Sequence, residues 1–201
     1  MSFAQLARSV EESLGQEHRY AHSVRVARAA DLLAQRHGLD ARKARLAGLL
    51  HDLARLYSPQ QLLTECEARG LSIDAAERAH PMLLHAKLGA AIARERFGVE
   101  DAEVLSAIEK HTTGAGEMTP LDCVVYLADS LEPGRSFPER AGLWRLAYDN
   151  LAEAMRGVLL LGIRHDARKG RAVVPATLAA AAAFGLAGAY ELQAEVQSSA
   201  S

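Results

Sequence analysis

Six residues of types that commonly bind metals interrupt apolar, helix-patterned stretches of this chain: His22, His51, Asp52, His85, His111 and Asp129. The stretch AGLLHDLARLY, residues 47 to 57, is the clearest case. Its leucines have the spacing of one buried helix face, yet an imidazole and a carboxylate lie between them. An unpaired charge on such a face is costly.

Any one of these residues alone is explained as a hydrogen-bonded core histidine or a helix cap. Together they weaken that explanation, because buried charges are mostly paired or metal-bound and the predicted inner faces offer no matching lysine or arginine. Imidazole nitrogen and carboxylate oxygen form the donor set that suits zinc, iron, manganese or nickel. Six such ligands exceed the need of one tetrahedral zinc and suit two metals that share a bridging carboxylate.

The elements that carry these residues are all predicted to be helices. Apolar residues recur with helical period along almost the whole chain, and we expect an all-α fold of about nine helices. Asp40 is the expected N-cap of the third helix. The predicted ranges are 3–14, 18–36, 41–56, 59–70, 84–97, 101–110, 122–131, 138–163 and 175–195, and the third of them carries Leu46 to Leu56. Residues 1–196 are predicted to form one domain, with a metal core at 18–135, C-terminal helices at 138–196 and a flexible tail at 197–201.

Composition excludes several classes of protein. The chain has 201 residues, enough for one good core, and its 49% hydrophobic and 24% charged residues are typical of a globular protein. A net charge of −2 with interspersed signs excludes the electrostatic footprint of a duplex-binding protein. The apolar run at 177–190 is too short for a membrane span. Two lone cysteines, Cys66 and Cys123, and no signal peptide favour a reducing, cytoplasmic setting.

The order His … His-Asp … His … His … Asp resembles the HD-domain superfamily of metal-dependent phosphohydrolases, named for the adjacent pair that here is His51-Asp52. Longer segments are similar to one bacterial family in it, the YqeK-like symmetrical bis(5′-nucleosyl)-tetraphosphatases. The resemblance covers roughly residues 15 to 190 and includes HRYAHSVRVA (18–27), AGLLHDLAR (47–55), HPMLLHAKLGAAIA (80–93) and IEKHTTGAGEMTPLDCVVYLADSLEPGR (108–135).

The resemblance implies a single HD-domain helical bundle and a ligand set for two divalent ions. Asp52 would bridge, with His22, His51 and Asp129 completing one site and His85 and His111 the other. Iron is the metal it implies, with manganese, cobalt, magnesium or nickel as alternatives, since these ions share a preference for nitrogen and oxygen donors.

One ligand position has two candidates, His80 and His85, both in HPMLLH. We prefer His85, because HAKLG meets the superfamily spacing from this ligand to the glycine, Gly89, which also leaves room beside the imidazole. His80 would then line the substrate pocket or orient a ligand, since metal-bound imidazoles need such partners.

The expected chemistry is hydrolysis without a covalent protein intermediate. Two metals about 3.5–4 Å apart lower the pKa of a water between them, so that hydroxide attacks phosphorus. Asp52 and Arg55 are the predicted catalytic residues; Arg55 stands where the superfamily commonly has lysine, and the two are not interchangeable. The predicted substrate-binding residues are Arg19, His80, Lys87, Thr112, Gly114 and Arg135, and the aromatic rings available to stack on a base are Tyr20, Tyr57 and Phe137.

By resemblance, the expected activity is the symmetrical cleavage of diadenosine tetraphosphate to two ADP. The alternatives are an HD phosphohydrolase acting on a mononucleotide, a dNTP or a cyclic dinucleotide, a non-catalytic metal-binding regulator, and a nucleotide sensor that has lost catalysis. The expected partner is a dinucleoside polyphosphate, with no nucleic acid or membrane. The apolar last helix either packs internally or forms a homodimer face.

Overall fold

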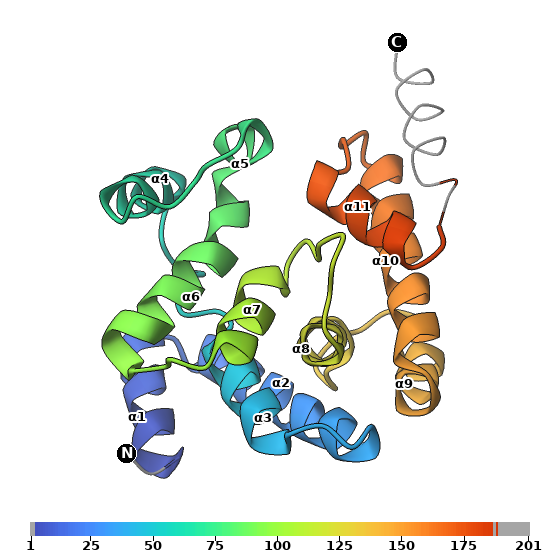
Figure 1. Ribbon diagram of the computed structural model, residues 1–201, viewed down its shortest axis with the longest axis horizontal. Helices are drawn as coiled ribbons and strands as arrows, with labels where there is room; N and C mark the ends of the chain where they lie inside the picture. The colour runs from blue at the N-terminus through green and yellow to red at the C-terminus, as the bar shows by residue number, and fades with distance from the viewer. Residues whose placement is uncertain (1–2, 187, 189–201) are drawn as a thin grey trace.

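The fold is entirely helical across the residues that the structure, a computed structural model, describes, which are 3–186 and 188 (Figure 1). This confirms the predicted all-α class, with eleven α-helices and one short 3₁₀ helix in that part of the chain rather than about nine. The helices are α1 (Phe3–Leu14), α2 (Glu17–Arg36), α3 (Ala41–Leu50), α4 (Pro59–Ala68), α5 (Ala75–Ala79), η1 (Pro81–Leu83), α6 (Leu84–Phe97), α7 (Ala102–Lys110), α8 (Pro120–Leu131), α9 (Arg140–Asp149), α10 (Leu151–Arg168) and α11 (Pro175–Ala183).

Short polar side chains set the helix starts. The predicted cap Asp40 is confirmed, because its carboxylate accepts hydrogen bonds from the backbone of Arg42 and Lys43. Thr119 begins α8 in the same way and is paired with Asp122 in a reciprocal capping box. These caps place the two helices that matter most for the site, α3 and α8.

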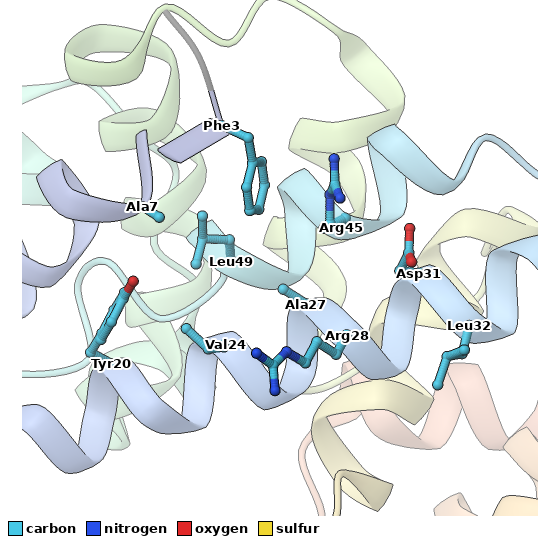
Figure 2. A pocket seen from close by; sticks show the side chains of 10 residues that line it. All are labelled: Phe3, Ala7, Tyr20, Val24, Ala27, Arg28, Asp31, Leu32, Arg45 and Leu49. Carbon is cyan, nitrogen blue, oxygen red and sulfur yellow. The ribbon is translucent and has the colours of Figure 1, made fainter. Parts of the chain in front are cut away.

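The N-terminal half is built on α2, which packs against α1, α3 and α8. Between α1, α2 and α3 lies a cavity of about 460 Å³, around which Figure 2 shows Phe3, Tyr20, Val24 and Leu49. Helix α8 lies at the centre of the molecule, with α2, α3 and α7 on one side and α9 and α10 on the other (Figure 1).

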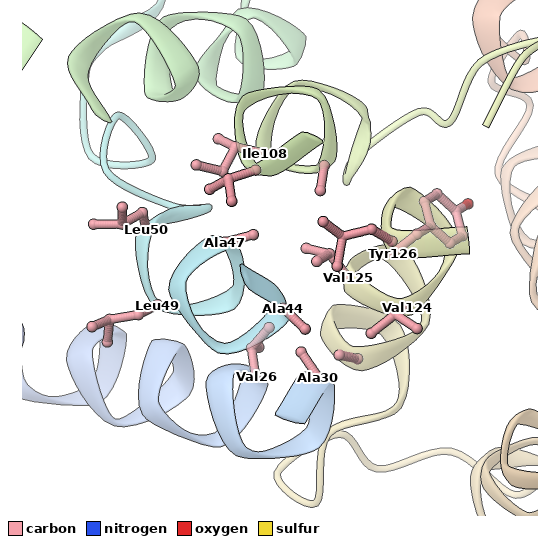
Figure 3. Packing of buried hydrophobic residues seen from close by; sticks show 14 of the residues in the cluster. Val26, Ala30, Ala44, Ala47, Leu49, Leu50, Ile108, Val124, Val125 and Tyr126 are labelled. Atoms are coloured by element: carbon pink, nitrogen blue, oxygen red, sulfur yellow. The ribbon is translucent and has the colours of Figure 1, made fainter. Parts of the chain in front are cut away.

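Small residues let α2 and α3 approach closely. A Cβ atom added to Gly48 would lie 3.0 Å from the Cα atom of Ala27, so α3 touches the backbone of α2. Figure 3 shows the buried side chains that meet around this contact, with Val26 from α2, Ala44 from α3 and Val125 from α8 among them. Tight packing of this kind fixes the relative position of α2 and α8, which carry His22 and Asp129, and of α3, which His51 and Asp52 follow.

Several helix boundaries differ from the prediction, most clearly after α3 and in the C-terminal part of the described chain. Helix α3 ends at Leu50 rather than Leu56, and residues 51–56 form turns held by hydrogen bonds from the Leu53 amide to the Leu50 carbonyl and from the Arg55 amide to the Asp52 carbonyl. The predicted helix 138–163 is two helices, because Asn150 has extended backbone and its side chain caps α10.

The last predicted helix, 175–195, also ends early. Helix α11 stops at Ala183, followed by a turn in which Gly185 has a φ of 77°. The remainder of that prediction, to Glu195, and the predicted tail at 197–201 lie outside the described residues. The described part of this apolar segment packs internally, against α10. Within the described residues, every helix is too short or too polar to cross a membrane.

Candidate metal centre

The six predicted ligands come together at one point, although they are up to 107 positions apart. Five are buried and the sixth, Asp129, is half-buried. Each comes from a different element except for one adjacent pair: His22 lies on α2, His51 and Asp52 follow α3, His85 lies on α6, His111 follows α7 and Asp129 lies on α8.

Three of the four imidazole rings are oriented by the same local contact. In each, Nδ1 donates a hydrogen bond to the backbone carbonyl three residues earlier: His51 to Gly48 at 2.8 Å, His85 to Met82 at 2.5 Å and His111 to Ile108 at 2.7 Å. Two of these rings follow the end of a helix, where carbonyl groups lack a helical partner and are free to accept. The bond fixes the proton on Nδ1 and leaves Nε2 facing the centre.

The fourth ring, His22, is oriented by a residue that the sequence reasoning missed. Its Nδ1 lies 3.1 Å from Oε1 of Glu132, which is 1% exposed. Glu132 also accepts hydrogen bonds from Nε of Arg25 and the backbone N–H of Gly134, both at 2.5 Å. These donors hold the pKa of Glu132 below its usual value even though burial raises it. Glu132 therefore stays ionised and keeps the proton of His22 on Nδ1.

Asp52 lies between two groups of imidazoles. Its Oδ1 is 3.4 Å from Nε2 of His85 and 3.9 Å from Nε2 of His111, whereas its Oδ2 is 3.7 Å from Nε2 of His51 and 4.0 Å from Nε2 of His22. The two oxygens of one carboxylate thus face two different pairs of nitrogen atoms.

Asp129 joins the second of these groups. Its Oδ1 is 3.0 Å from Nε2 of His22 and 3.7 Å from Nε2 of His51. Two sets of ligand atoms are close enough to hold a metal ion, one with His22, His51 and Asp129 and the other with His51, Asp52 and His111. The sets share His51.

The donor atoms at this centre are suited to a cation. Nε2 of His51 is buried and has no hydrogen-bond partner. Nε2 of His85 and Nε2 of His111 face each other at 3.2 Å, and both rings already carry their proton on Nδ1. Burial lowers the pKa of His85, and it lowers that of His111 to about 3, so both rings are neutral near pH 7. Two lone pairs at this distance repel, and a shared cation would offset that repulsion, so the residues fit a divalent metal.

The prediction that no arginine pairs with the inner carboxylates was wrong. Arg135 Nη2 is 2.6 Å from Oδ1 of Asp129, and Arg19 Nη1 is 3.7 Å from Oδ2 of Asp52. The predicted catalytic residue Arg55 is half-buried, and its positive charge contributes to lowering the pKa of His85. An arginine therefore lies beside each of the two carboxylates of the centre.

Three other predicted substrate-binding residues have different surroundings. Lys87 is engaged elsewhere, since its Nζ is 2.6 Å from Oε1 of Glu77 and 2.7 Å from the carbonyl of Ser72. The backbone N–H of Gly114 donates to the carbonyl of Lys110, so it is not available to phosphate. His80 is exposed, at the junction of α5 and η1.

Thr112, in contrast, does lie at the centre. Its Oγ1 is 3.0 Å from Nε2 of His111 and 3.2 Å from Nε2 of His85. The hydroxyl therefore reaches both nitrogen atoms of the first group.

Gly89 leaves room for a different group than predicted. A Cβ atom at this position would lie 3.2 Å from the backbone oxygen of His51, not against the ring of His85. The glycine lets α6 approach the turn that carries His51 and Asp52, and so brings His85 within reach of that carboxylate.

Comparison with known proteins places this chain among relatives of recorded activity. The profile of the HD domain family matches residues 19–134. A symmetrical bis(5′-nucleosyl)-tetraphosphatase of Bacillus subtilis is 38% identical over 69% of this chain and 74% of its own length. Its counterpart of the same name in Halalkalibacterium halodurans is 37% identical over 81% of this chain and 87% of its own length.

A solved structure agrees with these relatives. A crystal structure from Clostridium acetobutylicum, described as a predicted HD superfamily hydrolase involved in NAD metabolism, has a TM-score of 0.87 and 32% sequence identity. The match covers 92% of this chain and 97% of that one, so the likeness extends beyond the metal centre to the helices around it.

Proposed function

The chain belongs to the HD domain family, and within it to the symmetrical bis(5′-nucleosyl)-tetraphosphatases, and from this premise we propose that it hydrolyses diadenosine tetraphosphate to two ADP. The observation that supports the proposal best is the convergence of four imidazole Nε2 atoms and two carboxylates on one buried point. This is the donor set of a divalent metal, and metal-assisted hydrolysis needs no protein nucleophile.

Two ions, rather than one, are proposed for this site. The support is that the two carboxylate oxygens of Asp52 face different histidines. Oδ1 faces His85 and His111, and Oδ2 faces His51 and His22. We propose iron as the metal. The proposed ligands are His22, His51, Asp52 and Asp129 for one ion, and Asp52, His85 and His111 for the other.

A divalent metal bound here supplies Lewis acidity, which lowers the pKa of water and offsets negative charge on a phosphate oxygen. The chain's own arginines position the remaining phosphates. Arg135 is 43% exposed, and it has N–H groups to spare beyond its contacts with the carboxylate and the backbone carbonyl of Asp129. Arg19 and Arg55 add positive charge on the Asp52 side. Two ADP result when water attacks the second or third phosphorus and the bond to the central bridging oxygen breaks.

The test is product analysis on metal-loaded protein. Protein purified and incubated without oxygen is assayed with diadenosine tetraphosphate, products are resolved by ion-exchange chromatography, and bound metals are identified by elemental analysis. We expect ADP as the sole product, lost in Asp52→Ala and kept in Asp149→Ala, which removes an exposed carboxylate. AMP with ATP would contradict symmetrical cleavage. Absence of cleavage by a protein that holds two metals would direct the search to mononucleotides, dNTPs and cyclic dinucleotides.

A further inference from the structure

A cavity of about 550 Å³ adjoins the metal centre at Asp129, which is one of its lining residues. It lies between α8, the segment after it, α9 and α10, and we call it the α8–α10 cavity. Asp129 and Arg135 line one end of it. Its volume is in the range of sites for small organic ligands. Because Asp129 belongs both to the metal centre and to this cavity, a molecule whose phosphate is at the centre has the cavity within reach of its next group.

The walls of the α8–α10 cavity are suited to a flat ring. Phe137 lines it and packs against the hydrophobic core, which fixes the ring in place. Leu143 of α9 and Val158 and Leu161 of α10 line it as well. Aromatic and aliphatic side chains of this kind bind the apolar faces of a purine base.

Other residues that line the cavity are polar. His165 and Arg168, from the last two turns of α10, offer hydrogen-bond donors, and Glu139 offers an acceptor. A nucleobase has both donors and acceptors on its edge, and a ribose has hydroxyl groups. The cavity therefore combines an apolar wall for the base with polar groups for its edge and sugar.

The other two aromatic candidates for base stacking are placed differently. Tyr20 lines the cavity between α1, α2 and α3 (Figure 2), which shares no lining residue with the α8–α10 cavity. Tyr57 packs against the core at the end of the turn that follows α3. Of the three aromatic residues, Phe137 shares a cavity with a residue of the metal centre.

We infer that the α8–α10 cavity binds one nucleoside of the substrate, with the base against Phe137 and the adjoining phosphate at Arg135. This inference rests on the proposed function, since it takes the substrate to be a dinucleoside polyphosphate. It makes the cavity a determinant of substrate affinity and not of the chemical step.

The test fills the cavity from a position that has no packing role. Gly162 lines the α8–α10 cavity, and a Cβ atom at this position has no neighbour within 4 Å, so Gly162→Leu extends into the cavity without disturbing α10. The matched control is Gly142→Leu on α9, a helical glycine with the same free space that does not line the cavity. Elemental analysis and thermal melting should show unchanged metal content and stability for both variants.

Two readouts separate the inference from the proposed function. We expect Gly162→Leu to raise the KM for diadenosine tetraphosphate at least tenfold with kcat within about twofold, and to raise the Kd of ADP, measured by calorimetry on metal-loaded protein, by a similar factor. Gly142→Leu should match the wild type in both. Unchanged KM and Kd in Gly162→Leu, or a loss confined to kcat, would overturn the inference. The two failures can be told apart because ADP binding needs no turnover. Failure of the wild-type protein to cleave the substrate would refute the proposed function, and the ADP measurements would still test the cavity.

Discussion

Replacing Glu132 by glutamine should weaken metal binding without touching a proposed ligand. Both carboxylate oxygens of Glu132 accept hydrogen bonds: Oε1 from His22 Nδ1, and Oε2 from Arg25 Nε and the Gly134 amide. The side-chain amide of glutamine has one oxygen and one NH₂ group. In either orientation the NH₂ group faces a hydrogen-bond donor, which is His22 at one position and Arg25 and the Gly134 amide at the other. A buried donor left unpaired costs about 1–3 kcal/mol.

The expected effects follow from that cost. For a chain of this size we expect the melting temperature of the metal-free protein to fall by roughly 2–12 °C, at about 2–4 °C per kcal/mol. Loss of a carboxylate that orients a metal-binding imidazole lowers metal affinity about 10–100-fold. Kcat should fall only through the loss of metal, so saturating metal should restore it.

The assay is competition for the metal with a chelator of known affinity, together with thermal melting. The matched control is Glu103→Gln, which removes an exposed carboxylate paired with Lys43 and should change the free energy of unfolding by less than about 1 kcal/mol. If Glu132→Gln binds metal as tightly as the wild type, the ring of His22 does not depend on Glu132, and the reasoning is refuted.

Two further predictions concern packing and burial. Gly48→Ala should destabilise the protein by about 1–3 kcal/mol, because its Cβ meets the backbone of Ala27 at 3.0 Å, and a melting temperature no lower than that of a Gly142→Ala control would show that α2 can move aside. Cys66 and Cys123 should resist iodoacetamide at pH 8 in the folded protein and react in urea, as mass spectrometry would show, because burial raises the pKa of both thiols, that of Cys123 to about 12, and keeps them protonated. Labelling of either thiol under native conditions would mean that its helix opens.

The polar residues of the centre could be predicted because each is visible locally. His51 and Asp52 stand out against the leucines of one helical stretch, and Asp129 stands out in CVVYLADSL. A helical period shows which face is buried, and a polar residue on that face needs a partner. The period cannot show how the helices dock, but burial of all these faces in one core brings the polar residues together.

Glu132 and its arginine partner were not predictable in the same way. Glu132 precedes Pro133 and Gly134, so the sequence pattern marks it as a helix end. Its contacts with His22 and Arg25 join positions 110 and 107 residues apart, and no local pattern reports such a pair. The same is true of the ion pair between Arg19 and Asp52.

The end of α3 shows a different limit. The apolar spacing continues through Leu53, so pattern alone extends the helix. In the structure the ring of His51 donates a hydrogen bond from Nδ1 to the backbone carbonyl of Gly48. The helix ends at Leu50, and the backbone then turns. The spacing of apolar residues does not show where a side chain competes for a backbone hydrogen-bond acceptor.

Three imidazole rings are oriented by a backbone carbonyl and one by a distant side chain, so the two halves of the centre differ in how well they keep their geometry when a helix moves. His51, His85 and His111 each take their direction from a carbonyl in the same turn of chain, so they keep it when neighbouring helices shift. His22 takes its direction from Glu132, just beyond α8, and α8 also carries Asp129. A small outward movement of α8 would therefore release two donors at once and leave the nitrogen atoms of His85 and His111 aimed at Asp52. On the proposal of two ions, the ion held by His22 and Asp129 would be lost and regained more readily than the other.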